Sequence, residues 1–87
     1  MEAWFAGRVQ GVGFRYTVKK LATGFDVTGT VANLSDGRVH LVAEGEASEL
    51  EDFLQALPNA GLGSLIRETE VQWTDPAGNL RGFEIIR

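Results

Sequence analysis

The sequence predicts an α+β fold in which two helices cover one face of an antiparallel sheet. Three observations support this prediction. Apolar residues recur at helical spacing in two stretches, β-branched segments flank each stretch, and an Asp-Gly step joins the two middle segments. With 87 residues, 44% of them apolar, the chain is long enough for a single small core. We therefore expect residues 1–87 to form one domain.

The first part of the chain alternates between strand and helix signals. Residues 3–9 are rich in aromatic and β-branched types and predict a first strand. After a glycine-rich turn, the spacing predicts a helix of about ten residues, with Gly24 placed as its C-terminal cap. Its apolar face consists of Phe14, Val18, Leu21 and Ala22.

A hairpin is predicted in the middle of the chain. Residues 27–34 and 38–44 carry β-branched side chains at short intervals, as strands do. Between them stands Ser35-Asp36-Gly37, and an Asp-Gly step favours a tight turn. His40 alternates with Val39 and Leu41, so we expect its side chain on the solvent side of the sheet.

A second helix and two more strands complete the pattern. Ser48 and Glu51 have the spacing of a capping box, and Pro58 is expected to end the helix. Its apolar stripe consists of Leu50, Phe53, Leu54 and Leu57. Residues 66–74 predict a strand with one polar face, and residues 82–86 predict a short last strand.

The element order is β-α-β-β-α-β with a short additional strand at the end. Two βαβ-like halves joined by a hairpin form the ferredoxin-like sandwich, with both helices on one face of an antiparallel sheet. A polar face on the fourth strand fits a sheet whose second face meets water. This architecture carries many unrelated activities, so it leaves the function open.

Composition excludes several classes of function. Cysteine is absent and His40 is the single histidine, so no disulfide, thiolate site or zinc cluster is expected. A net charge of -4 argues against a general nucleic-acid binder or a binder of anionic membranes. No apolar stretch approaches the ~18 residues of a membrane span. We expect a soluble cytoplasmic protein that binds neither nucleic acid nor membrane, and a monomer, because no apolar helix face is left over.

The stretch GRVQGVGFR, residues 7–15, has the composition of an anion-binding turn. Glycines permit positive φ and leave backbone N–H groups uncovered, and the helix that follows adds its own unpaired donors. A guanidinium at Arg15 would add a planar fork of donors. The stretch matches neither a Walker A loop nor a dinucleotide fingerprint, and a plain tight turn is the alternative. The candidate contributors are Val9, Gln10, Gly11, Val12, Gly13, Phe14 and Arg15.

Residues 7–15 resemble the signature of the acylphosphatase family. A second family motif has its counterpart at residues 29–33, and the likeness extends over nearly the whole chain. The resemblance implies metal-independent hydrolysis of the carboxyl–phosphate bond of acyl phosphates. It also implies that the loop amides cradle the phosphate, that Arg15 binds the substrate, and that Asn33 positions the nucleophilic water.

One residue departs from the family pattern, which usually has an aromatic side chain where this chain has Thr30. Alternation along a strand places Gly29, Val31 and Asn33 on one face and Thr30 on the other. We therefore expect Thr30 to affect stability or surface contacts rather than the chemistry.

The chemistry implied by the resemblance needs nothing that the sequence lacks. An acyl phosphate expels a carboxylate whose conjugate acid has a pKa of roughly 4, so no general acid is required. Positioning and electrostatic stabilisation supply most of the catalysis in phosphoryl transfer. Arg15, the loop amides and Asn33 can provide both, and we expect neither a metal nor another cofactor.

Two other functions remain open at this level. A phosphate- or acyl-phosphate-binding module of the same fold would keep the loop and hydrolyse poorly. An RNA-binding domain of ferredoxin-like fold would need exposed aromatic residues on its central strands and a basic surface. Residues 38–44 contain no aromatic side chain and the net charge is negative, so RNA binding is disfavoured.

Overall fold

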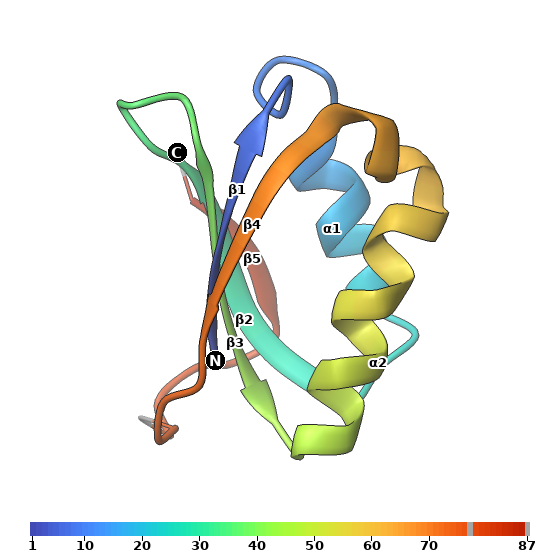
Figure 1. Ribbon diagram of the computed structural model, residues 1–87. Helices are drawn as coiled ribbons and strands as arrows, with labels where there is room; N and C mark the ends of the chain where they lie inside the picture. Colours follow the sequence, from blue (N-terminus) through green and yellow to red (C-terminus); the bar gives the residue numbers. More distant parts are fainter. Residues whose placement is uncertain (77, 87) are drawn as a thin grey trace.

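A computed structural model describes residues 1–76 and 78–86 and has two layers, a sheet and a pair of helices packed on one of its faces (Figure 1). This is the predicted ferredoxin-like arrangement. The elements are β1 (Glu2–Gly7), α1 (Phe14–Ala22), β2 (Val27–Asn33), β3 (Val39–Gly45), α2 (Ala47–Leu57), the helical turns η1 (Pro58–Leu62) and η2 (Gly63–Leu65), β4 (Ile66–Gln72) and β5 (Phe83–Ile86).

The sheet has five strands in the order β4-β1-β3-β2-β5. The predicted antiparallel pairing holds for β1 with β3, β1 with β4 and β2 with β3. The prediction is wrong for β5, which pairs with β2 in parallel. The reason is topological: β4 ends where β2 begins, so a chain that crosses this end of the sheet starts β5 in the direction of β2 (Figure 1).

The core lies between the sheet and the two helices. The predicted stripes are buried at Phe14, Val18 and Ala22 of α1 and at Leu50, Phe53 and Leu57 of α2. Phe53 is fully buried, and its ring lies 5.6 Å from that of Phe25 and 5.8 Å from that of Phe83. Burial of one such side chain stabilises the fold by about 1.5–3 kcal/mol. The core therefore joins both helices to the sheet, and Val9 of the β1–α1 loop belongs to it.

Several predicted boundaries are wrong. The capping box at Ser48 does not form, because α2 begins at Ala47 with Glu46 as its N-cap. Thr23, not Gly24, caps α1, and its hydroxyl donates to the Lys20 carbonyl at 2.7 Å. The first strand ends at Gly7 instead of residue 9, after an irregularity in its pairing with β4. The fourth strand ends at Gln72, two residues before the predicted end.

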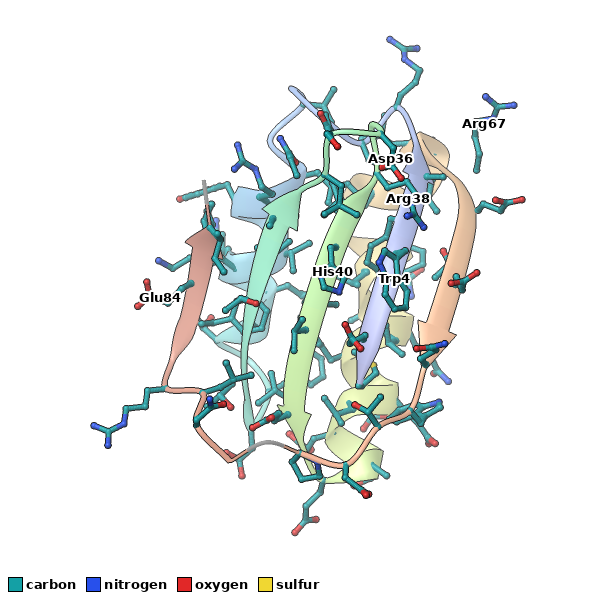
Figure 2. The ribbon with its side chains drawn as sticks, turned by 90° about the vertical axis from the view of Figure 1, so that its left-hand side faces the viewer. Trp4, Asp36, Arg38, His40, Arg67 and Glu84 are labelled. Carbon is teal, nitrogen blue, oxygen red and sulfur yellow. The ribbon has the colours of Figure 1, made fainter. Side chains whose placement is uncertain are left out.

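The open face of the sheet carries the predicted solvent-side histidine (Figure 2). His40 stacks on Trp4 with ring centroids 5.0 Å apart, and its Nε2 lies 2.9 Å from Glu2 Oε1. Thr30 is paired with Val42 on β3 and is partly exposed. No helix within residues 1–76 and 78–86 has the length and apolar character needed to cross a bilayer.

Candidate functional site

The turn between β1 and α1 owes its shape to glycines in the left-handed region. Gly11 has φ 75° and Gly13 has φ 78°, a conformation that costs other residues about 1–2 kcal/mol. A Cβ at either position would meet no atom within 4 Å, so backbone conformation and not space requires glycine here. The sequence places these glycines where the chain turns from the sheet into the helix.

The N-terminus of α1 is uncapped by side chains. Gly13 is its N-cap residue, no side-chain cap bond is made, and its first turn contains no acidic residue. The first amides of a helix lack intrahelical partners and carry the positive end of the helix dipole. This end of α1 is therefore suited to an anion.

A cavity of about 270 Å³ lies beside this helix end. It brings together the loop, the first turn of α1, the end of β2 and strand β5. Its lining consists of Val9, Gly11, Gly13, Phe14, Arg15, Tyr16, Asn33 and Ile85. Arg15 and Asn33, the two predicted catalytic residues, thus share one cavity although they come from different elements.

Asn33 is the last residue of β2, at the rim of this cavity. Its Oδ1 atom is buried, and no group in the described part of the chain hydrogen-bonds to it. A buried acceptor without a partner costs about 1–3 kcal/mol. Because Asn33 lines the cavity, its carboxamide lies close to any small molecule bound there and has an acceptor that no described group uses.

Arg15 is the second residue of α1, and its guanidinium is weakly held. Its Nη1 donates to the Ile86 carbonyl at 3.4 Å. Among residues 1–76 and 78–86, Arg38 forms an ion pair with Asp36 and His40 contacts Glu2, and no described carboxylate pairs with Arg15. Most of its five N–H donors remain available for a ligand anion.

Two of the seven predicted loop residues do not line the cavity. The Gln10 side chain points to the hairpin between β2 and β3, where its Nε2 donates to the Leu34 carbonyl at 2.8 Å and to the Arg38 carbonyl at 3.0 Å. Val12 is exposed on the loop. The cavity is lined by the other five.

Two residues that line the cavity, Tyr16 and Ile85, are not among those predicted from the sequence. Tyr16 is 66% exposed and directly follows Arg15, so an exposed aromatic residue beside the turn was an available signal. Ile85 reaches the cavity from β5, at the edge of the sheet. No local pattern marks Ile85, because its place depends on the parallel pairing of β5 with β2.

Fold and site define a class: a small ferredoxin-like α+β domain whose glycine-rich strand-to-helix loop faces an arginine and an asparagine. The model of the acylphosphatase family matches residues 1–85. The chain is 40% identical to an acylphosphatase of Salinibacter ruber, over the whole of this chain and 92% of the relative. It is 44% identical to an acylphosphatase of Thermus thermophilus, over 91% of this chain and 89% of the relative.

Solved structures agree with these relatives. The crystal structure of acylphosphatase from Bacillus subtilis superposes with a TM-score of 0.89 at 35% identity, over 99% of this chain and 96% of that one. The crystal structure of HypF from T. kodakarensis gives a TM-score of 0.84 at 30% identity, but there the match covers 11% of the longer chain. The chain belongs to the acylphosphatase family, as the motifs predicted. It is a hydrolase of the class that cleaves acyl phosphates.

Proposed function

We propose that the cavity beside α1 is the active site, in which the loop amides and Arg15 bind the phosphate and Asn33 holds the attacking water. The observation that carries this proposal is that Asn33, whose buried Oδ1 has no partner in the described structure, lines the same cavity as Arg15. An acceptor in that position can take one hydrogen bond from a water molecule. The water oxygen would then lie between Asn33 and a phosphate bound at the helix N-terminus.

The reaction needs few groups from the protein. The water oxygen forms a bond to phosphorus while the bond between phosphorus and the acyl oxygen breaks, and the electron pair of that bond leaves with the carboxylate. A carboxylate of pKa roughly 4 departs without a proton. The proton of the attacking water ends on an oxygen of the product phosphate. The residues are thus required for positioning and charge stabilisation, and the reaction proceeds without a metal.

Electrostatics at this helix end favour the transition state. The transferring phosphoryl group spreads negative charge over three oxygens. The amides at the start of α1 are donors fixed in place by the helix, so they need little reorganisation as charge develops, and the Arg15 guanidinium adds a positive charge from the first turn. Because the product phosphate can bind to the same donors, we expect inorganic phosphate to inhibit competitively with the acyl phosphate substrate.

We also propose that the protein is a cytoplasmic monomer and acts on a small acyl phosphate. Phosphate esters and anhydrides are anions that do not cross an apolar bilayer unaided, so the enzyme would act where its substrate is made. The large exposed apolar side chains found in the described structure are Val12, Tyr16, Trp73 and Ile86, too few for an extensive subunit interface. Sedimentation of the purified protein tests the monomer, and a stable dimer would contradict it.

Binding of inorganic phosphate distinguishes a phosphate site at this loop from a plain turn that binds no ligand. A ligand that binds the native state alone raises the melting temperature. We expect millimolar phosphate to raise the melting temperature of the wild type and not that of Arg15→Ala. Arg8→Ala, which removes an exposed arginine at the other end of the loop, is the matched control and should respond as the wild type does. Equal shifts in wild type and Arg15→Ala would contradict the proposed site.

The alternative, a weakly catalytic binding module, predicts the same phosphate shift. Only turnover distinguishes the two. The unpaired Asn33 Oδ1 favours the enzyme, because a binding module has no use for an acceptor beside a phosphate site.

A further inference from the structure

The side chain of Gln10 crosses from the loop to the β2–β3 hairpin. Its Nε2 lies 2.8 Å from the Leu34 carbonyl oxygen and 3.0 Å from the Arg38 carbonyl oxygen, in a partly buried position. A side-chain amide nitrogen has two N–H donors, and these two carbonyls use both. No donor of this amide is left for a phosphate in the cavity.

The two carbonyls belong to the neck of the hairpin. The Leu34 N–H donates to the Arg38 carbonyl at 2.8 Å, and the Gly37 N–H donates to the Leu34 carbonyl at 3.2 Å. Gln10 therefore joins the loop to the residues that close the hairpin. Leu34 directly follows Asn33, the last residue of β2, so the Leu34–Ser35 peptide held by Gln10 lies just past the end of that strand.

We infer that Gln10 is a positioning residue, which sets the distance between the phosphate-binding loop and the Asn33 side chain. This inference rests on the proposed function of Asn33. The Asn33 Oδ1 has no hydrogen-bond partner in the described structure, and the Asn33 backbone is held in the sheet by pairing with Val39 of β3. The hydrogen bond from Gln10 to the Leu34 carbonyl ties the loop to the residue after Asn33.

The hairpin does not depend on Gln10 for its closure. Without the Gln10 amide, the Leu34 carbonyl keeps the Gly37 N–H and the Arg38 carbonyl keeps the Leu34 N–H. A variant without the amide is therefore expected to fold, with the β1–α1 loop free to shift against the end of β2, which stays paired with β3 and β5. A displacement of about 1 Å in a catalytic arrangement can lower the rate about a hundredfold.

The test compares Gln10→Met, which removes the donors at similar length, with the wild type and with the same change in an Asn33→Ala background. We expect kcat for benzoyl phosphate to fall about tenfold to a hundredfold in Gln10→Met, with the inhibition constant of inorganic phosphate changed less than about twofold. In the Asn33→Ala background the same change should alter the residual kcat less than about twofold, because both substitutions act on one step.

A matched control removes an amide-to-carbonyl bond elsewhere. Asn59 donates from Nδ2 to the Gln55 carbonyl at 3.3 Å, outside the site, and Asn59→Ala should keep the kcat of the wild type. If circular dichroism shows that Gln10→Met does not fold, Gln10→Asn, which withdraws the amide by one methylene, is measured in its place. We expect the same result, a lower kcat with a nearly unchanged inhibition constant of inorganic phosphate.

Three results would overturn the inference. An unchanged kcat, even with a lower melting temperature, would make Gln10 merely structural. A rise in the phosphate inhibition constant at constant kcat would make it a phosphate ligand. An equal loss of kcat with and without Asn33 would show that it acts elsewhere. If Asn33→Ala alone kept the kcat of the wild type, the proposed function itself would be contradicted. If Asn33→Ala lost activity while Gln10→Met kept the kcat of the wild type, only the inference about Gln10 would be contradicted.

Discussion

Arg15 and Asn33 line one cavity of about 270 Å³, Arg15 from the first turn of α1 and Asn33 from the end of β2. The parallel course of β1 and β2 brings this about. The C-terminal ends of both strands lie at the same end of the sheet, so the loop after β1 and the last residue of β2 lie together. The sheet thus brings a helix end suited to an anion close to a carboxamide oxygen that has no partner among the described residues.

Replacement of Arg15 by lysine tests the geometry of the guanidinium separately from its charge. Lys keeps the charge but loses the planar fork that matches phosphate oxygens. Loss of a charge-assisted hydrogen bond costs about 1.5–3 kcal/mol, so we expect the phosphate inhibition constant to rise about tenfold to a hundredfold. Steady-state inhibition of benzoyl phosphate hydrolysis measures it. A variant with the inhibition constant of the wild type would show that Arg15 acts by charge alone.

Asn33→Ala is expected to lose activity without losing stability. The substitution removes a buried acceptor whose desolvation no described protein partner offsets. We expect the free energy of unfolding to rise, or to fall by no more than about 0.5 kcal/mol. We expect kcat to be almost completely lost. Urea denaturation measures this free energy, and a loss of several kcal/mol would mean that the side chain has a structural role.

Gly13→Ala and Gly61→Ala form a matched pair. Both glycines have positive φ, 78° and 88°, and at both a Cβ would meet open space. Each change should therefore cost about 1–2 kcal/mol of stability through backbone strain. Gly13→Ala alone should also weaken phosphate binding, because Gly61 lies in η1, outside the cavity. Titration with phosphate at a temperature where both variants are folded separates the effects, and equal affinities would count against a role for the loop conformation.

Stability at acid pH should depend on the hairpin carboxylate. Hydrogen bonds from the Arg38 backbone N–H and then from its side chain hold the pKa of Asp36 below its usual value of 3.8. A depressed folded-state pKa contributes stability above the unfolded pKa, and this contribution is lost as the pH falls through the folded value. Asp36→Asn should therefore show a shallower loss of stability below pH 3.8, measured by denaturation across this range. The same pH dependence in both proteins would refute the argument.

The parts of the fold that the sequence predicts well are local. The stripe of Phe14 and Val18 and that of Phe53 and Leu57 are buried as their spacing requires, because helix periodicity needs only neighbours along the chain. The prediction of a capping box at Ser48 is wrong although its pattern is local. Since α2 begins at Ala47, Ser48 lies inside the first turn of the helix and cannot be its N-cap.

The features that the sequence did not predict depend on distant partners. The parallel pairing of β5 follows from where β4 ends, and with it comes Ile85 in the cavity wall. The direction of the Gln10 side chain follows from carbonyls on the hairpin, far along the chain. Loop composition identified Gln10 as a contributor to the site without indicating which side of the loop its amide would face.

Hydrolysis of benzoyl phosphate in the presence of EDTA tests the central claim most directly, with Arg15→Ala and Asn33→Ala measured beside the wild type and Arg8→Ala as the control. We expect turnover by the wild type and by Arg8→Ala, and near-complete loss in the two site variants while circular dichroism shows them folded. Either Arg15→Ala or Asn33→Ala turning over at the rate of the wild type would contradict the proposed site. An inert wild type that still binds phosphate through Arg15 would leave a binding module in place of an enzyme.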